Sequence, residues 1–145
     1  MVNLTRIYTR TGDDGSTALA DFSRTSKTDS RLGAHADVDE ANAALGVVLA
    51  LSEVDADVAE LLREIQNDLF DVGADLATPV VADPEPPPLR VTEAYIARLE
   101  AACDKYNAEL APLRSFILPG GTPAAALLHV ARTTVRRAER TTWQA

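Results

Sequence analysis

The sequence predicts an all-α protein, an antiparallel bundle with four evident helices in one domain of residues 1–145. Only 5% of the residues are aromatic and 25 are alanine, a composition that favours closely packed helices over a β-sandwich. Apolar residues recur at three- and four-residue spacing in the later part of the chain, and no strand of consequence is predicted. The composition, 46% hydrophobic and 25% charged, is typical of a soluble globular domain.

The first half of the chain divides into an extended segment and two helices. Residues 1–29 are rich in Thr, Ser, Asp and Gly and lack helical periodicity, which predicts an extended, ligand-facing or flexible segment. A first helix is expected over residues 30–51, with an acidic face. The second helix is expected to begin at a capping box of Asp57 and Glu60 and to end at Ala77.

The second half contains a proline-rich linker and two more helices. Five prolines in residues 78–90 predict a stiff connection without regular structure. Thr92 is the expected N-cap of the third helix, in which Cys103 is predicted to pack in an apolar stripe. Thr122 and Pro123 are the expected N-cap and first residue of the fourth helix. The apolar stripe of the third helix consists of Ile96, Leu99, Cys103, Tyr106 and Leu110.

Charge and cysteine content exclude several classes of protein. The net charge of −8 and pI near 4.7 argue against a nucleic-acid-binding protein. A single cysteine excludes a disulfide framework and fits the cytoplasm. No apolar run approaches the roughly 20 residues that span a bilayer, so no membrane partner is expected.

Arginines gather on one face of the fourth helix. His129, Arg132, Arg136 and the pair Glu139 and Arg140 recur at helical spacing, so that they share this face. Guanidinium groups stacked in this way repel one another, and carboxylates from a neighbouring helix or subunit, or a polyphosphate, would compensate. A solvated cationic face that complements the helix dipole is the alternative interpretation.

Two other segments have features of a binding site. In residues 7–17, Gly12 and Gly15 allow close backbone approach and hydroxyl side chains surround them, which suits a phosphate cradle; an ordinary turn is the alternative. Residues 116–121, Phe-Ile-Leu-Pro-Gly-Gly, form an apolar run whose default interpretation is a buried connection between helices. With only two histidines, His35 and His129, a histidine-based triad or a multi-histidine metal site is not expected, and no metal-ligating residues are assigned.

Together these segments resemble the PduO-type ATP:cob(I)alamin (corrinoid) adenosyltransferases. The resemblance follows five motifs in order along the whole chain. They are residues 8–15 (Tyr-Thr-Arg-Thr-Gly-Asp-Asp-Gly), residues 31–46 with Val38-Asp39-Glu40, residues 65–74, residues 116–121, and residues 129–140 with Arg136-Arg137-Ala138-Glu139-Arg140. Asp14 stands where the family commonly has Lys, and His35-Ala36 replaces a frequent Tyr-Gly.

The resemblance implies a five-helix bundle that forms homotrimers with active sites between subunits, and the family's last helix is expected to be absent from this sequence. It implies ATP contacts from Arg10, Thr11, Gly12, Asp13, Asp14, Gly15, Ser16, Thr17, Ala18 and Lys27, completed by Arg132, Arg136, Arg137, Glu139 and Arg140 of a neighbouring subunit. It also implies three catalytic residues. Asp39 and Arg132 would form a salt bridge between subunits, and Phe116 would close the lower face of the corrin and keep cobalt four-coordinate.

The implied reaction transfers the 5′-deoxyadenosyl group of ATP to the cobalt of cob(I)alamin and releases triphosphate, with Mg²⁺. Because the cobalt is itself the nucleophile, the protein needs only to align the substrates and stabilise the leaving group. A flavin reductase and an adenosylcobalamin-dependent mutase would be partners. A non-catalytic cobalamin carrier or chaperone on the same bundle is the main alternative, and a structural helical oligomer is another.

Overall fold

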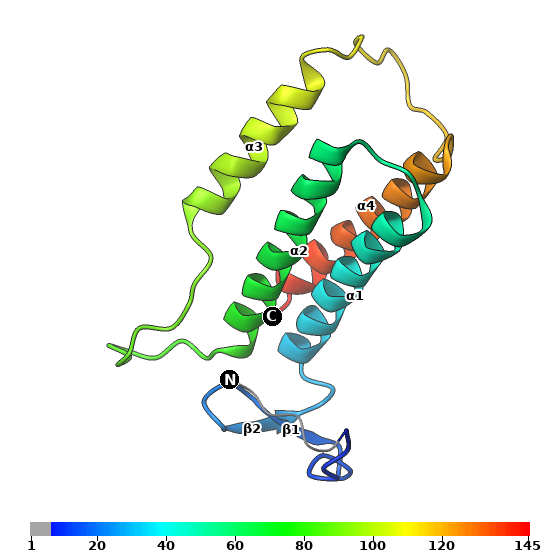
Figure 1. Ribbon diagram of the computed structural model, residues 1–145. Helices are drawn as coiled ribbons and strands as arrows, with labels where there is room; N and C mark the ends of the chain where they lie inside the picture. Colours follow the sequence, from blue (N-terminus) through cyan, green and yellow to red (C-terminus); the bar gives the residue numbers. More distant parts are fainter. Residues whose placement is uncertain (1–6) are drawn as a thin grey trace.

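The computed structural model describes residues 7–145, and in this part of the chain it contains four helices and one small hairpin. The hairpin consists of β1 (Ser16–Ala18) and β2 (Arg24–Ser26). The helices are α1 (Ser30–Leu51), α2 (Ala56–Ala77), α3 (Glu93–Asn107) and α4 (Pro123–Thr142) (Figure 1). The predicted all-α class is therefore confirmed, and α1 has the expected bounds.

Helix α1 lies between α2 and α4 and packs against both of them. Leu45 and Val48 of α1 form a core cluster with Leu62 of α2 and Ala131 of α4. Most of the other buried apolar residues are alanines, such as Ala34 and Ala41, which are 0% exposed. Small side chains let the helix axes approach closely, so that the core is thin but tightly packed.

Amide side chains fix the contact between α1 and α2. The Asn42 side chain donates to the backbone carbonyl of Gln66 at 3.0 Å, and the Gln66 side chain donates to the backbone carbonyl of Asn42 at 3.1 Å. Asn42 is only 6% exposed, so these reciprocal bonds satisfy polar groups that would otherwise be buried without partners.

The N-terminus of α4 is capped as the sequence predicts, whereas that of α2 is not. The Thr122 hydroxyl accepts a hydrogen bond from the backbone N–H of Ala125, and Pro123 occupies the first turn. In α2 the N-cap is Asp55 rather than Asp57. The Asp57 carboxylate instead accepts from the Lys105 ammonium at 3.0 Å and the Tyr106 hydroxyl at 2.9 Å, both in α3. The predicted capping box is wrong because α2 begins at Ala56, which places Asp57 inside the first helical turn instead of at the cap.

Helix α3 stands apart from the other helices (Figure 1) and buries none of its residues. Its connections to α2 are polar: Arg98 pairs with Asp68, and the Tyr95 hydroxyl donates to Asp71 at 2.8 Å. The predicted packing of Cys103 is wrong, since this cysteine is exposed. The helix also ends at Asn107, before Leu110, so the apolar stripe is shorter than predicted and open to solvent.

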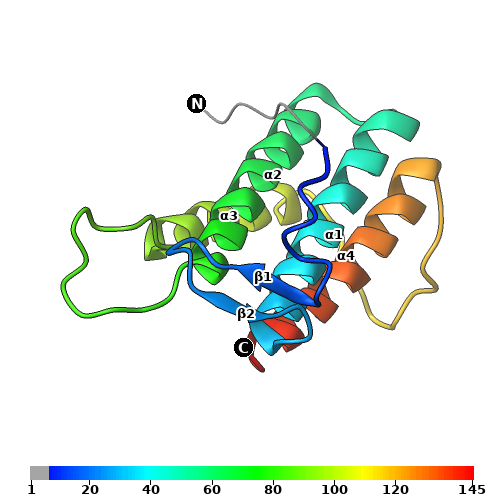
Figure 2. The same cartoon turned by 90° about the horizontal axis from the view of Figure 1, so that it is seen from below.

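The hairpin and the connection from α3 to α4 lie at opposite ends of the bundle (Figure 1). β1 and β2 pair antiparallel, with Thr17 opposite Thr25. Seen from below, the hairpin lies in front of the ends of the helices (Figure 2). The segment predicted to be extended thus contains a short sheet, while residues 108–122 form the connection at the far end.

The glycine at position 33 lies in the first turns of α1 and is exposed, and a Cβ added there would have no neighbour within 4 Å. We expect Gly33→Ala to stabilise the protein by about 0.5–1 kcal/mol, because alanine loses less backbone entropy in a helix. Thermal unfolding followed by circular dichroism measures this effect. Gly121→Ala is the control: Gly121 has φ +112°, and its added Cβ would lie 3.3 Å from that of Ala125, so this variant should melt at a lower temperature. A lower Tm for Gly33→Ala would contradict the prediction.

Candidate functional site

Arg24 and Asp14 hold the loop that precedes β1 in a defined shape. The Arg24 guanidinium donates to the backbone carbonyl of Thr11 at 2.8 Å and, through Nε, to the Ser16 hydroxyl at 3.1 Å. The Asp14 carboxylate accepts from the Ser16 backbone N–H at 2.9 Å and hydroxyl at 2.7 Å. These bonds from Ser16 hold the pKa of Asp14 below its ordinary value. Asp14 therefore stabilises the turn.

Lys27 lies directly beside Gly12. A Cβ added to Gly12 would lie 2.8 Å from the Ser16 carbonyl oxygen and 3.1 Å from Nζ of Lys27, so only glycine fits here. The backbone N–H of Lys27 also donates to the carbonyl of Gly15 at 2.9 Å. The backbone of Arg10 adopts φ +62°, a left-handed conformation that is uncommon for a residue other than glycine.

The structure thus brings the predicted loop of residues 10–18 and Lys27 together in one exposed surface loop. Backbone N–H groups, hydroxyls and cations in such an arrangement suit an anionic ligand with several oxygens. Sequence reasoning missed Arg24 as a member of this loop. The signal was that five of the chain's 14 cations, Arg24 among them, fall in residues 1–31, but the partners of Arg24 depend on the pairing of β1 with β2.

The arginine row of α4, which we define as Arg132, Arg136 and Arg140, is exposed as the helical spacing predicts. Glu139 is exposed as well. The opposite side of α4, with buried Ala131, Thr134 and Ala138, faces the bundle. Val130, by contrast, is 57% exposed. The row is therefore free to meet a ligand or a second protein surface.

Arg137 differs from its neighbour Arg136, because it joins α4 to α1. Its Nε donates to the Asp37 carboxylate at 3.0 Å, and its terminal nitrogen pairs with Glu40. These two carboxylates raise the pKa of Arg137, and the arginine in turn lowers the pKa of Glu40. Arg137 was predicted together with the other nucleotide contacts, but within this chain its guanidinium is engaged in a contact between helices.

Asp39 and Arg132 are both exposed, and neither forms an ion pair with another residue in the described range 7–145. Beside Asp39 lies a hollow of about 150 Å³ between α1 and α2. His35, Asn42, Phe70 and Gly73 are among the residues that line it. Asp39 is thus available to a partner outside the chain.

Phe116 is fully exposed, at 106% of its reference accessible surface. Ile117 and Leu118, which follow it, are 58% and 92% exposed. The prediction of a buried apolar connection is therefore wrong, because residues 108–122 pass outside the bundle instead of between helices. The exposed ring is left with no packing role inside the described chain.

The loop of residues 10–18 and the segment of residues 108–122, which contains Phe116, do not meet within one chain. The loop of residues 10–18 lies at the hairpin end of the bundle, and residues 108–122 lie at the other end (Figure 1). A 22-residue helix such as α1 is about 33 Å long, which sets the scale of this separation. Among residues 7–145, no hydrogen bond or ion pair joins residues 7–27 to α4 or to residues 108–122.

The described part of the chain has neither a cluster of metal-ligating side chains nor a helix that could span a membrane. Nowhere in residues 7–145 do three or more His, Cys, Asp or Glu side chains gather closely enough to hold a metal ion. None of the helices in that range is both long and apolar enough to cross a bilayer.

A helical bundle that exposes a row of arginines and a glycine-containing loop with a lysine belongs to the class of proteins that can bind anionic ligands at their surface. Residues 7–145 match the model of the cobalamin adenosyltransferase family, and the chain belongs to that family.

Curated relatives and solved structures agree with this assignment. The chain is 65% identical over 144 residues to a corrinoid adenosyltransferase of Mycobacterium tuberculosis, covering 99% of this chain and 75% of the relative. It is 60% identical over 147 residues to that of Mycobacterium leprae, with coverage of 99% and 77%. A variant PduO-type ATP:corrinoid adenosyltransferase from Lactobacillus reuteri, complexed with cobalamin and ATP, superimposes with a TM-score of 0.87 at 40% identity, with coverage of 96% and 77%.

The neighbours Arg136 and Arg137 should respond differently to truncation. We expect Arg137→Ala to lower the Tm at pH 7 by a few degrees, because it removes two ion pairs between α1 and α4. Arg136→Ala, the matched control, should leave the Tm unchanged. Since Arg137 lowers the pKa of Glu40, this stabilisation is present above the unfolded pKa of glutamate and is lost as the pH falls through the lower folded value. Thermal unfolding at pH 7 and near pH 3 should therefore show a difference between wild type and Arg137→Ala that shrinks in acid. Equal Tm values at pH 7 would contradict the assignment.

Proposed function

We propose that this chain is an ATP:corrinoid adenosyltransferase. It transfers the 5′-deoxyadenosyl group of ATP to the cobalt of cob(I)alamin and produces adenosylcobalamin and triphosphate. The observation that carries the proposal is the preformed loop of residues 10–18 with Lys27 against Gly12, an anion cradle in a chain whose family and relatives carry this activity by name.

The chemistry needs no nucleophile from the protein. Cobalt(I) attacks the 5′ carbon of ATP, so that a cobalt–carbon bond forms while the carbon–oxygen bond breaks and its electron pair leaves with triphosphate. The residues of the loop and Lys27 hold the triphosphate, and the arginine row of α4 offsets the negative charge that develops on it. The main contribution of the protein is to align the two substrates within reach of in-line attack.

Mg²⁺ enters this proposal as a companion of the triphosphate. Magnesium usually keeps several waters and binds through one or two carboxylates together with substrate phosphates. Asp13, an exposed carboxylate within the loop, fits that mode.

The separation between the loop of residues 10–18 and the segment that contains Phe116 supports an active site shared between chains. Because residues 10–18 and residues 108–122 lie at opposite ends of the bundle (Figure 1), the loop of one subunit and the Phe116 segment of another would have to meet for attack to occur. We propose a homotrimer in which Arg132 of one subunit pairs with Asp39 of the next. A flavin reductase that supplies cob(I)alamin, a mutase that accepts the product, and a cytoplasmic location complete the proposal.

A spectrophotometric assay of adenosylcobalamin formation from ATP and chemically reduced cobalamin tests the activity. A rise in Tm with MgATP tests the triphosphate cradle separately. The competing carrier hypothesis predicts cobalamin binding with neither product formation nor an effect of MgATP, since a carrier has no need of a triphosphate cradle. That result would refute the proposed activity.

Phe116→Ala should impair the handling of cobalt without destabilising the fold. Since the ring is fully exposed, the Tm should stay within about 1 °C of wild type, in contrast to the roughly 3–5 kcal/mol that loss of a core phenylalanine costs. Loss of the ring should let water or the cofactor's own base reach the lower axial position. The electron paramagnetic resonance spectrum of Co(II)balamin with MgATP should then lose its four-coordinate signal while MgATP binding persists. An undiminished four-coordinate signal would rule out the role of Phe116.

Two inactive variants should complement each other if the site is shared. Gly12→Ala should disable the loop, because its Cβ would collide with the Ser16 carbonyl and displace Lys27, and Arg136→Ala should disable α4. When the two chains are mixed, dissociated and reassembled, about one site in four combines an intact loop with an intact α4, so about a quarter of wild-type activity should return. Each variant reassembled alone is the control. Activity that stays at the level of the single variants would place the site within one chain.

A further inference from the structure

The hairpin that carries the candidate nucleotide loop docks on the C-terminal end of α2. In the turn between β1 and β2, the backbone N–H of Ala20 donates to the carbonyl of Ala77 at 2.9 Å. Of the hydrogen bonds that residues 7–28 make in the described structure, this is the one that reaches a helix, since Asp29, the partner of Thr25, precedes α1. The position of Ala77 therefore helps to set the position of the hairpin.

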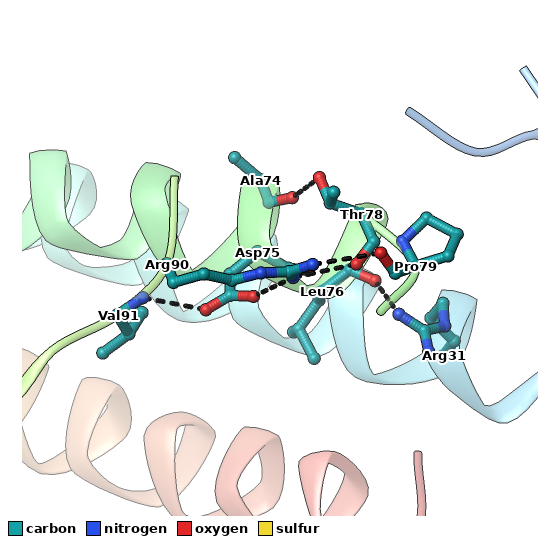
Figure 3. Close-up of polar contacts among 8 residues, drawn as sticks. All are labelled: Arg31, Ala74, Asp75, Leu76, Thr78, Pro79, Arg90 and Val91. Atoms are coloured by element: carbon teal, nitrogen blue, oxygen red, sulfur yellow. Dashed lines mark hydrogen bonds and ion pairs between the residues drawn. The ribbon is translucent and has the colours of Figure 1, made fainter. Parts of the chain in front are cut away.

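Two arginines from outside α2 hold this end of the helix (Figure 3). Arg31 of α1 donates to the carbonyl of Leu76 at 2.8 Å. Arg90, which lies just before α3, donates to three carbonyls, those of Asp75 at 3.2 Å, Thr78 at 2.9 Å and Pro79 at 3.0 Å. Guanidinium groups are favourable at a helix C-terminus, where carbonyls lack partners and the dipole is negative.

Asp75 holds Arg90 in place. Its carboxylate pairs with the Arg90 guanidinium and also accepts from the backbone N–H of Val91 at 2.8 Å (Figure 3). The side chains of Arg90 and Asp75 are 31% and 26% exposed, so this pair is partly shielded from water. The guanidinium of Arg90 presents five N–H donors in a planar fork, whereas a lysine ammonium has three on one nitrogen, fewer than the three carbonyls and the carboxylate that Arg90 bonds.

We propose that Arg90 and Asp75 are positioning residues for the nucleotide loop. They fix the end of α2, on which the hairpin docks through Ala20, and so they preorganise the loop of residues 10–18, which leads into the hairpin and includes β1. This inference rests on the proposed function, in which that loop binds ATP. Loss of Arg90 should therefore weaken MgATP binding although Arg90 does not touch the nucleotide.

Arg90→Ala tests the proposal, and Arg98→Ala is its matched control. Arg98 also pairs with an aspartate of α2, Asp68, but in the middle of the helix and away from Ala77. In Arg90→Ala the Ala20 amide should exchange its hydrogen about tenfold faster, and the KM for ATP should rise about tenfold, while kcat and the KM for cobalamin change less than twofold. Arg98→Ala should leave all four quantities unchanged, and Arg90→Lys should recover only part of the effect.

A second variant keeps the test decisive if Arg90→Ala unfolds. Ala20→Pro removes the donor N–H and leaves the end of α2 intact, and it should raise the Kd for MgATP in the same way. Unchanged Ala20 exchange in folded Arg90→Ala would overturn the docking role. Faster Ala20 exchange with unchanged MgATP affinity would overturn the link to the nucleotide. Failure of the proposed function is recognised separately, because the wild-type protein would then form no adenosylcobalamin, while hydrogen exchange still reports on docking.

Discussion

The close approach of α1 to both α2 and α4 is the constraint on which the rest of the structure depends. Ala34, Ala41 and Ala131 supply almost no side-chain bulk at these contacts and are nearly inaccessible to solvent. A thin core of this kind does not tolerate larger side chains, because they would overpack the contacts and push the helices apart. Because the alanine face of α4 packs against α1, the arginine row on the opposite face of the helix points to the outside of the bundle.

The helices of this bundle could be predicted where their signals are local. The Thr122 cap and the proline that follows it lie within one turn of α4. The apolar periodicity of α1 and α2 marks the faces by which these two helices pack in the bundle. The predicted packing of the apolar stripe of α3 was wrong. Such a stripe indicates that one face of a helix is apolar, but it does not show which other element, if any, packs against that face. Asp57, Asp68 and Asp71 of α2 meet α3 with polar groups, so that its apolar residues and Cys103 remain exposed.

The candidate site shows the same division between local and distant information. The loop of residues 10–18 could be predicted because its glycines and hydroxyls are contiguous. Arg136 and Arg137 could not be distinguished by residue type, yet successive residues lie about 100° apart around a helix, and only Arg137 reaches Asp37 and Glu40. Arg24 was missed for a related reason, since its contact with Ser16 depends on the register of β1 and β2.

Two features of the isolated chain are unfavourable, and the proposed reaction would relieve both. A fully exposed Phe116 followed by an exposed Leu118 leaves a large apolar area in water, and the arginine row repels itself along α4. A flat corrin ring would cover the first, while a triphosphate or an aspartate of another subunit would neutralise the second. In the proposed homotrimer, a second chain would supply the loop of residues 10–18 and so bring the triphosphate to these two surfaces. Assembly and substrate binding would then draw on the same exposed surfaces, so that the complete site would exist only where subunits and substrates meet.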